Sequence, residues 1–293
     1  MEPPLSPLGN NVKKKIICIL LCAGEGTRIR NHIENIPKAL ISLAYLQNKP
    51  ILYDTINKLL KFDIEKLIII TGYLKQNIEE YVKNLTFQPK NLKDKILLFD
   101  SGFEYRKGSL YSFLSFTRNT HFFKEDKVYI LLPGDTIFDF SLLNEIFSQI
   151  NKLINKKKST CVIPFRKIKI GSLKGLSKNS LHDSKIFISF AKSKSKNKQK
   201  YLKKIIQRDL SKISKKKDIF QIIPCFMFNF NFIQKIKNII QKSNINSVRE
   251  VINLIAKKEN NIYLLQIDQN LGFIDIDTYE DLQNLNNTKK GGQ

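Results

Sequence analysis

The sequence lacks several patterns that define common protein classes. No apolar run approaches the roughly 20 residues that span a bilayer, and the first ten residues, MEPPLSPLGN, lack the charged and then apolar layout of a signal peptide. The four cysteines, Cys18, Cys22, Cys161 and Cys225, form no Cys-x-x-Cys pair. We therefore expect a cytoplasmic protein with buried thiols, and neither disulfides nor a cysteine metal site.

Histidine is also scarce, and this narrows the chemistry. The three histidines, His32, His121 and His182, stand in no metal-ligand pattern, so we assign them to surface or loop positions. No serine, histidine and acid arrangement is supported by spacing, and the sequence contains no internal repeat. A triad hydrolase and a repeat architecture are therefore not expected.

Acidic residues are nearly missing from one segment. The whole chain has a net charge of +24, and between Asn151 and Lys217 there are 22 basic residues against only Asp183 and Asp209, a net of +20. An anionic partner would explain this excess, and so would a solvated lysine face in a chain rich in Lys, Asn and Ile. We favour the solvated face, because aromatic residues that stack on bases are not interleaved with these charges. Nucleic acid is not expected as a partner, while contact of 166–217 with an anionic surface stays open.

Apolar residues make up 42% of 293 positions, enough for one large α/β core or two smaller ones. Continuous apolar runs over Ile16 to Cys22, Leu67 to Thr71 and Val128 to Leu132 are typical of strands buried on both faces of a parallel sheet. Helices are expected between them, at Pro50 to Lys61 and Lys75 to Asn84. This alternation predicts an α/β fold, a Rossmann-like three-layer αβα sandwich around a mostly parallel, mixed central sheet.

The rest of the chain continues the alternation. Further strands are expected over Lys95 to Phe99, Thr160 to Phe165, Ile186 to Phe190, Ile219 to Phe230 and Tyr263 to Ile267. Further helices are expected from Ser109 and over Leu142 to Ile154, Phe232 to Ile240, Val251 to Lys257 and Tyr279 to Leu285. Ser141 should cap the second of these helices, and capping boxes of Ser247 with Glu250 and of Thr278 with Asp281 should precede the last two. We expect a disordered leader at 1–13, one domain over 14–287 with a lysine-rich insertion at about 166–217, and a tail at 288–293.

The segment from Leu21 to Leu40, LCAGEGTRIRNHIENIPKAL, follows the first strand directly. We call it the glycine loop. Glycines 24 and 26 let the backbone turn tightly and bring N–H groups against an anion, while Arg28 and Lys38 add positive charge. A strand-to-helix loop with two turn glycines would explain the glycines alone, but the whole spacing favours a polyphosphate site.

Two further loops carry small residues beside predicted element ends. Gly72 and Tyr73 follow the second strand, where ligands of open α/β sheets gather, so this loop should face the glycine loop. Gly108 and Ser109 begin an amphipathic helix, where a base or phosphate can lie against backbone N–H groups. A simple helix cap by Ser109 is an equally good interpretation of that pair.

Acidic side chains follow or lie within two predicted strands. Asp135 comes after the strand Val128 to Leu132, in Pro-Gly-Asp, where a carboxylate is well placed to hold a divalent cation. In GFIDIDT, residues 272–278, period-two alternation puts Asp275 and Asp277 on one strand face. Solvent exposure alone would explain such a pair, but together with Asp135 the two acids predict a magnesium site.

These motifs resemble the nucleotidyltransferases that activate sugar, polyol or amino-alcohol phosphates with a nucleoside triphosphate. Gly-x-Gly-Thr-Arg, separated by eight residues from Pro-Lys-Ala-Leu, resembles the glycine loop of that family. The stretches IIITGYLKQNIEEY and YRKGSLYSF are similar to CTP:phosphocholine cytidylyltransferases, and GFIDIDTYEDL is also similar to CTP:inositol-1-phosphate cytidylyltransferases. The resemblance spans about Ile16 to Asn286 and implies the nucleotide-diphospho-sugar transferase fold.

The resemblance implies in-line attack by an acceptor phosphate on the α-phosphorus, with pyrophosphate leaving. It implies Mg²⁺ on Asp135 and Asp275, with Asp277 nearby as an alternative ligand. Arg28 would neutralise the β and γ phosphates, and Lys38 would bind the α-phosphate and the acceptor phosphate. The implied nucleotide-binding set is Leu21, Ala23, Gly24, Gly26, Thr27, Tyr73, Gly108 and Ser109, with Ala23, Tyr73 and Ser109 around the base.

We therefore expect an enzyme, monomeric or homodimeric, that uses a nucleoside triphosphate, with CTP favoured, and a small phosphorylated alcohol or sugar. The alternatives are a sugar-1-phosphate uridylyl-, thymidylyl- or guanylyltransferase, and a non-catalytic nucleotide-binding relative. Joint presence of Arg28, Lys38, Asp135 and Asp275 argues against the non-catalytic alternative.

Overall fold

The structure is a computed structural model, and it describes residues 15–33, 35–87, 90–154, 159–168, 186–192, 200–207 and 219–287. The predicted leader at 1–13, the tail at 288–293 and most of the insertion at 166–217 lie outside these ranges. No helix within them is long and apolar enough to cross a membrane.

The described residues form a ten-stranded sheet in the order β11-β9-β10-β13-β8-β12-β6-β1-β4-β5. Its strands are β1 (Lys15–Leu21), β4 (Lys66–Thr71), β5 (Ile96–Asp100), β6 (Lys127–Pro133), β8 (Cys161–Ile168), β9 (Ile186–Lys192), β10 (Lys200–Gln207), β11 (Ile219–Ile222), β12 (Phe226–Asn229) and β13 (Ile262–Ile267). The run β6-β1-β4-β5 is parallel, as is the pair β13-β8, and antiparallel strands complete the mixed sheet.

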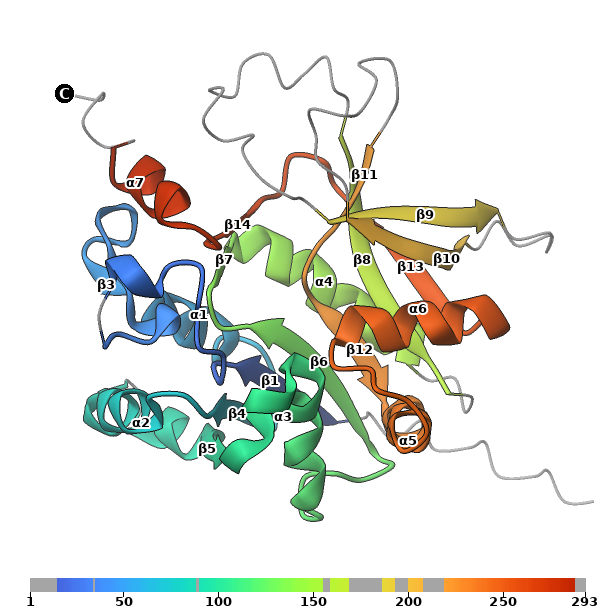
Figure 1. Cartoon of the computed structure of the whole chain (residues 1–293), viewed down its shortest axis with the longest axis horizontal. Helices are drawn as coiled ribbons and strands as arrows, with labels where there is room; N and C mark the ends of the chain where they lie inside the picture. The colour runs from blue at the N-terminus through green and yellow to red at the C-terminus, as the bar shows by residue number, and fades with distance from the viewer. Residues whose placement is uncertain are drawn as a thin grey trace, which may run out of the picture.

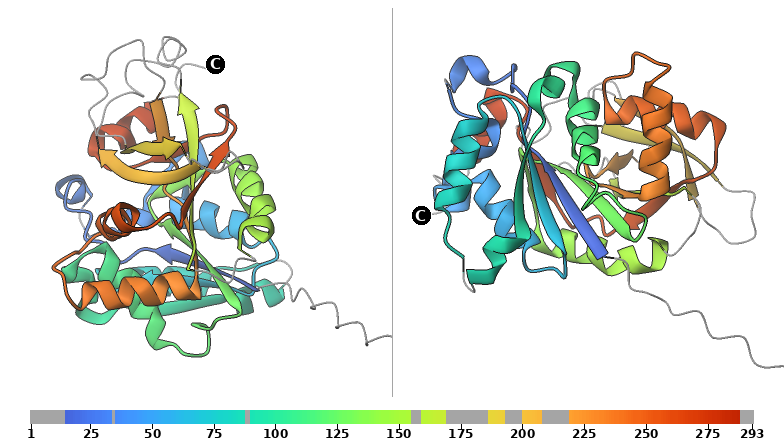
Figure 2. Two further views of the ribbon diagram at one scale, coloured as in Figure 1. Left: turned by 90° about the vertical axis from the view of Figure 1, so that its right-hand side faces the viewer. Right: turned by 90° about the horizontal axis from the view of Figure 1, so that it is seen from below.

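Helices cover both faces of this sheet, as Figures 1 and 2 show. One face carries α1 (Ile51–Leu59), α2 (Lys75–Asn84) and α4 (Phe140–Ile154), and the other carries α3 (Ser109–Ser115), α5 (Phe230–Ile240) and α6 (Val248–Lys258). Strand β1 explains the layering, because Cys18 and Leu20 belong to the first core while Ile17 and Ile19 belong to the second. The predicted three-layer α/β sandwich is confirmed.

A third, smaller core lies apart from the two sheet faces. It contains Ile29, Ile41, Leu43, Ile51, Ile137, Ile276, Leu282 and Leu285. Ile29 belongs to the glycine loop, Leu43 to β2 (Ser42–Leu43), which pairs with β3 (Lys49–Pro50), and Ile51 begins α1. Ile137 belongs to β7 (Thr136–Phe138), which pairs antiparallel with β14 (Phe273–Asp275), Ile276 follows β14, and Leu282 and Leu285 belong to α7 (Tyr279–Asn287). We call this the site core. Figure 1 shows α7 beside the segment before α1, so the two ends of the domain meet here.

Most predicted elements are present, with three corrections. Helix α4 begins at Phe140, so Ser141 lies inside its first turn and is not the cap. The single strand predicted over Ile219 to Phe230 is two strands, β11 and β12, because Pro224 between them has no N–H to donate. The predicted face-sharing strand 272–278 is shorter, since β14 ends at Asp275.

Helix ends predicted from short-range contacts of polar side chains agree with the structure at several places. Helix α2 has the predicted bounds, and Ser247 caps α6 by accepting from the Glu250 N–H at 3.2 Å. At α7, Asp281 accepts from the Thr278 N–H at 2.8 Å, and the Thr278 hydroxyl accepts from the Asp281 N–H at 3.2 Å. The predicted capping box at α7 is therefore confirmed in both of its bonds, whereas at α6 the Ser247 cap is confirmed and the helix begins at Val248, earlier than the predicted Val251.

The cysteine prediction also fits the structure. All four cysteines are buried and free, and burial raises the pKa of each thiol. A buried thiol with a raised pKa stays protonated and unreactive. These cysteines are therefore packing residues.

Candidate active site

The glycine loop turns sharply at Gly26. Its φ is +60°, and its carbonyl oxygen accepts from the N–H groups of Ile29 and Arg30, both at 3.0 Å. A Cβ at this position would lie 3.0 Å from the Lys38 Cγ. Glycine is therefore needed here twice, for the left-handed backbone and for the close passage of Lys38.

The outer part of the glycine loop faces solvent while one side chain anchors it. Gly24, Thr27 and Arg28 are exposed, whereas Ile29 is fully buried in the site core. The Leu21 carbonyl oxygen is already engaged, because it accepts from the Gly134 N–H at 3.0 Å. The glycine loop thus exposes a positively charged edge to solvent, while buried Ile29 and the bonded Leu21 carbonyl fix its position.

Lys38 joins the glycine loop to the two acidic segments. Its ammonium donates to the Ile276 carbonyl oxygen at 3.0 Å and to Asp135 Oδ2 at 3.3 Å, and lies 3.6 Å from Asp277 Oδ1. Only 13% of its side chain is exposed. Arg28 NH1 completes the contact by lying 3.3 Å from Asp277 Oδ2. The four predicted residues Arg28, Lys38, Asp135 and Asp277 are therefore brought together.

Asp135 is placed by tight packing at the end of β6. Gly134 lies so close to β1 that a Cβ on it would come within 2.3 Å of Cys22 Sγ. The Ile276 N–H donates to the Asp135 carbonyl oxygen at 3.4 Å, which joins this turn to the segment after β14. Burial raises the pKa of the Asp135 carboxyl; the nearby Asp277 charge raises it further, and Lys38 opposes both.

Asp275 reaches the site through strand pairing. Strand β14 runs antiparallel to β7, with Asp275 opposite Thr136, and the Thr136 hydroxyl donates to Asp275 Oδ1 at 2.8 Å. Loss of solvation raises the pKa of this carboxyl to about 7, and the charges of Asp135 and Asp277 contribute to the rise. Ile276, between the two acids, is fully buried in the site core, so the alternation predicted for the acids survives although Asp277 lies beyond the strand.

The loop after β4 contacts the glycine loop, as predicted. The Tyr73 N–H donates to the Ala23 carbonyl oxygen at 3.1 Å, and a Cβ on Gly72 would come within 3.0 Å of Ala23. The Arg30 guanidinium lies 5.3 Å from the centre of the Tyr73 ring. Ala23 and Tyr73 thus lie side by side, and Arg30, which sequence reasoning did not single out, covers the ring.

Gly108 has a clear packing role. Its φ is +114°, and a Cβ on it would come within 2.6 Å of the Asn246 carbonyl oxygen, which accepts from the Leu110 N–H at 3.0 Å. Ser109 is the first residue of α3 and makes no side-chain cap, so the simple capping interpretation is wrong. Nucleotide binding by Gly108 and Ser109 remains a prediction.

The histidines are peripheral, in keeping with the prediction for His32 and His121. His32 is exposed and stacks on Tyr279 with ring centroids 4.2 Å apart, and His121 is exposed in a turn. His182 lies outside the described residues. The stacked pair ties the glycine loop to the start of α7.

The acidic residues suit a divalent cation only in part. Asp135 and Asp275 offer carboxylate oxygens, and the pKa of each is raised by burial and further by the charges of neighbouring acids, which a cation would offset. Within the described ranges, however, no three potential ligand residues already form a metal-binding group, and Lys38 lies between Asp135 and Asp277. This donor set fits Mg²⁺ if phosphate oxygens complete the coordination, as is usual for that ion.

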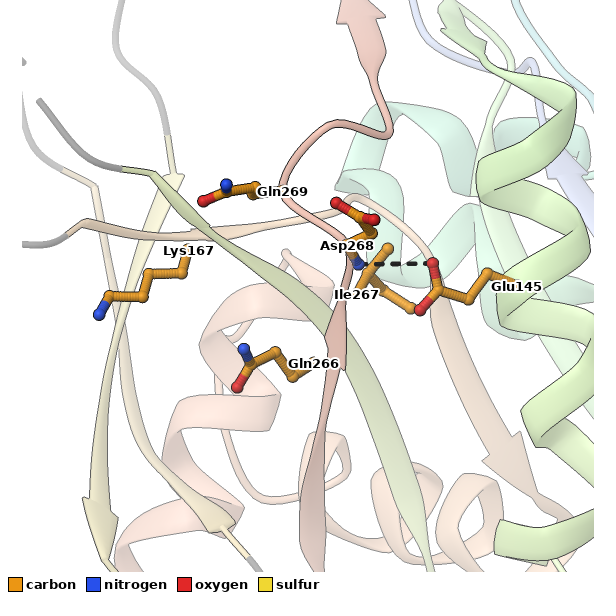
Figure 3. Close-up of a pocket in the computed structure, with 6 residues that line it drawn as sticks. All are labelled: Glu145, Lys167, Gln266, Ile267, Asp268 and Gln269. Carbon is orange, nitrogen blue, oxygen red and sulfur yellow. Dashed lines mark hydrogen bonds between the residues drawn. The ribbon is translucent and has the colours of Figure 1, made fainter. Parts of the chain in front are cut away.

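A separate hollow of about 510 Å³ lies beside the end of β13. It is lined by Glu145, Lys167, Gln266, Ile267, Asp268 and Gln269, which Figure 3 draws as sticks. The Asp268 N–H donates to Glu145 across its wall at 3.4 Å. None of the predicted site residues lines it, so the candidate active site is the loop cluster and not this hollow.

Sequence reasoning missed several groups that complete the site. Thr136 and the Ile276 carbonyl each contact a predicted residue, and both stand next to a predicted acid in the sequence. Adjacency to Asp135 and Asp275 was the available signal. Arg166 and Asp139, which contact the segment leading into β14, carried no such signal.

Known proteins resemble this chain in sequence. A family model described as nucleotidyl transferase matches residues 17–167. The "Bifunctional protein GlmU" of Methanococcus maripaludis is 34% identical over 124 residues, which are 42% of this chain and 26% of that protein. The choline-phosphate cytidylyltransferase of Streptococcus pneumoniae is 41% identical over 76 residues, 25% of this chain and 32% of that protein. The alignments thus span only about a quarter to a third of these relatives.

Solved structures share the fold over nearly the whole chain. A UDP-glucose pyrophosphorylase complexed with UDP-glucose has a TM-score of 0.67 at 14% identity and covers 95% of this chain and 100% of its own. The inositol-1-phosphate CTP transferase from T. maritima has a TM-score of 0.62 at 15% identity, covering 95% and 98%. At such identities the likeness establishes the fold alone.

The matched residues 17–167 make up more than half of the chain. They include the glycine loop, the loop after β4 and Asp135, which the structure brings to one edge of the sheet. The chain therefore belongs to the nucleotidyl transferase family.

Proposed function

We propose that this protein transfers a nucleoside monophosphate, CMP in preference to others, from a nucleoside triphosphate to a small phosphorylated alcohol or sugar. An acceptor phosphate oxygen attacks the α-phosphorus. The bond from the α-phosphorus to the bridging oxygen breaks, and pyrophosphate leaves with that oxygen. The observation that carries the proposal is the convergence of Lys38, Arg28 and the acids on the open edge of the glycine loop.

The exposed edge of the glycine loop supports triphosphate binding. Gly24 has no atom within 4 Å of the place where a Cβ would stand, so a phosphate can approach its backbone. Arg28 is 62% exposed and can turn from Asp277 to the β and γ phosphates. Neutralising these groups stabilises the departing pyrophosphate.

Lys38 supports the transfer step itself. Its ammonium is held by the Ile276 carbonyl and two acids, and is mostly shielded from water. A charge fixed in this way can meet the α-phosphate and the acceptor phosphate without reorganising, and it reduces their mutual repulsion.

Asp135 and Asp275 would hold Mg²⁺, with Asp277 as the neighbouring carboxylate. The ion would neutralise phosphate charge and align the reacting groups. The chain's own part is positional, since Thr136 fixes Asp275 and the Gly134 turn fixes Asp135.

The preference for CMP rests on likeness in sequence. The Streptococcus pneumoniae protein at 41% identity is a choline-phosphate cytidylyltransferase, and the motif after β4 resembles that group. A second candidate is transfer to a sugar 1-phosphate, because a D-glycero-alpha-D-manno-heptose 1-phosphate guanylyltransferase is 32% identical over 124 residues. Both candidates use the same site residues and differ in base and acceptor.

The test is pyrophosphate release from CTP, UTP, dTTP, GTP and ATP with Mg²⁺, against phosphocholine, inositol 1-phosphate, glycerol 3-phosphate and hexose 1-phosphates. We expect one pair to dominate, with a CTP pair first. Turnover with a sugar 1-phosphate and another triphosphate would establish the second candidate.

Variants connect the reaction to the site. Lys38→Ala and Asp135→Asn should each lower kcat by about 10²-fold to 10³-fold. Asp126→Asn and Lys66→Ala are matched controls and should retain the rate. Asp126 directly precedes β6 and Lys66 begins β4, so both lie at the strand ends away from the site. Normal turnover by folded Lys38→Ala and Asp135→Asn would refute the proposed roles.

A further inference from the structure

The segment that delivers Asp275 to the site is short and weakly paired. Strand β14 has three residues, and its partner β7 has three as well. Such a pair has little stability of its own. Its position therefore depends on contacts made by Leu271 and Gly272, just before it, and by its first residue, Phe273.

Arg166 contacts these residues from the neighbouring strand β8. Its NH1 donates to the Leu271 carbonyl oxygen at 2.7 Å, and its guanidinium lies 5.3 Å from the centre of the Phe273 ring. Its Nε donates to Gln221 Oε1 at 2.8 Å, and Gln221 is buried on β11. The Arg166 side chain therefore links strands β8 and β11 to the start of β14.

Asp139 holds the same segment from the other side. Its N–H donates to the Gly272 carbonyl oxygen at 3.1 Å, and its Oδ2 accepts from the Gly272 N–H at 2.8 Å. Gly272 lies between the two side chains, since a Cβ on it would be 2.9 Å from Asp139 Oδ2 and 3.9 Å from Arg166 NH1. The backbone at 271–272 is thus held through both its donors and its acceptors.

We propose that Arg166, together with Asp139, is a positioning residue that holds β14 so that Asp275 faces Asp135. Phe273 and Asp275 stand two residues apart and therefore share a strand face, so a shift of the Phe273 ring moves the carboxylate. The inference rests on the proposed function, in which Asp275 holds the divalent cation, and it assigns a role to the first residue of the predicted insertion.

The proposal implies that the two halves of the sheet position different residues of the site. The glycine loop and Asp135 belong to the parallel half of the sheet, whereas Asp275 is aligned by a residue of the other half. Residues that orient metal ligands commonly change metal affinity by about 10-fold to 100-fold when altered. Arg166 should therefore control cation affinity more than nucleotide binding.

The test uses Arg166→Gln and Arg166→Lys in the full chain. Hydrogen exchange of the amides at 273–276 should become faster in Arg166→Gln, while amides in β1 and β6 keep their rates. Binding of Mn²⁺ in the presence of CTP, or of the triphosphate that the panel selects, followed by electron paramagnetic resonance, should weaken about tenfold. KM for the triphosphate should change less than about twofold, and Arg166→Lys, which keeps one donor group, should fall between wild type and Arg166→Gln.

Asn253→Ala is the matched control. The Asn253 side chain, on α6, also donates to a backbone carbonyl and accepts from a backbone N–H, both of Ile205. Ile205 belongs to β10, which does not pair with β14. It should lower stability without changing exchange at 273–276 or Mn²⁺ affinity. If Arg166→Gln does not fold, Gly272→Ala, which pushes Asp139 Oδ2 aside, serves as the second variant and should give the same two changes.

Wild-type exchange and wild-type Mn²⁺ affinity in folded Arg166→Gln would overturn the positioning role. Equal changes in Asn253→Ala would overturn it too, because general loosening would then explain the result. Absence of turnover with every substrate pair would instead count against the proposed function, and the exchange measurement would still decide whether Arg166 holds β14.

Discussion

The two halves of the sheet are held together by different means. In β1, β4 and β6 of the parallel half, apolar side chains fill both faces, as Ile17, Cys18, Ile19 and Leu20 do in β1 at 0% exposure. In the half formed by β8 to β11 and β13, polar side chains carry part of the structure, with Arg166 bound to Gln221 and Asn253 bound to the Ile205 backbone. The first half is therefore held mainly by packing, whereas the second combines buried apolar residues such as Ile163 and Phe165 with specific hydrogen bonds.

The two halves of the sheet also position different parts of the candidate active site. The parallel half positions the glycine loop and Asp135 with a tight backbone fit at Gly134. Among the described residues of the other half, Arg166 reaches the segment that carries Asp275 with its side chain. A change in the first half should therefore disturb stability and the site together, whereas a change in the second can be specific.

The largest expected effect is on core packing in the parallel half. Ile19→Ala removes a fully buried side chain from the centre of β1 and should lower the free energy of unfolding by about 3–4 kcal/mol. Leu202→Ala in β10 should cost about 2 kcal/mol, because β10 lies near the sheet edge and can relax. Urea unfolding measures both, and equal losses would contradict the contrast between the halves.

A pair of glycines gives the next largest effect. Gly26→Ala and Gly102→Ala both place a side chain at a left-handed φ, +60° and +62°, which costs about 1–2 kcal/mol. Only Gly26 also lies against Lys38, while nothing stands within 4 Å of a Cβ on Gly102. We expect Gly26→Ala to lose at least about tenfold in pyrophosphate release, and Gly102→Ala to retain its rate. Similar rates for the two would show that the Lys38 contact is irrelevant.

A smaller effect tests the polar contacts of the second half. Asn253→Ala breaks two hydrogen bonds to Ile205, at 2.6 and 3.0 Å, and should lower the free energy of unfolding by about 1–2 kcal/mol. Asn253→Asp can still accept from the Ile205 N–H but repels its carbonyl oxygen, so it should be destabilised to a similar degree. A loss below about 0.5 kcal/mol in thermal or urea unfolding would show that packing alone holds α6 on β10.

The smallest expected effect is the pH-dependent change in stability caused by Asp275, which lies where the two halves of the sheet meet. The pKa of Asp275 is raised from its unfolded value to about 7, so the folded state binds the proton more tightly, and the resulting stabilisation is lost as pH rises through 7. Asp275→Asn imitates the protonated form. Without divalent cations it should raise Tm more at pH 8 than at pH 5, because the stabilisation is lost as pH rises from the ordinary pKa of 3.8 to the folded value of about 7. Because Asp275 is exposed as a residue, we expect a rise of only about 1–2 °C at pH 8.

Added Mg²⁺ should narrow this difference at pH 8 by neutralising the carboxylates of the wild type. Thermal scans at the two pH values, with and without Mg²⁺, measure it. A difference between Asp275→Asn and wild type that is the same at pH 5 and pH 8 would contradict charge repulsion as its cause.

Sequence patterns predicted the site best where local chemistry suffices. Gly26, Lys38 and Asp135 stand in loops and Asp275 at the end of β14, in motifs whose composition and spacing have few structural alternatives, and the structure brings them together. Strand β10 was missed, because its sequence KYLKKIIQ hides the buried Leu202 and Ile205 among lysines, and a register shift between Leu202 and Lys204 breaks the alternation. Period-two patterns fail where a bulge intervenes.

What the sequence by itself determined is the set of reactive groups and the apolar strands that carry them, because these depend on residue type and short-range spacing. Only the tertiary structure decided which groups meet. The contact of Lys38 with the Ile276 carbonyl joins residues 238 positions apart, and the Arg166 contact with Leu271 joins residues 105 apart. Such contacts follow from strand order and from packing in the site core, and neither can be computed from neighbours in the chain.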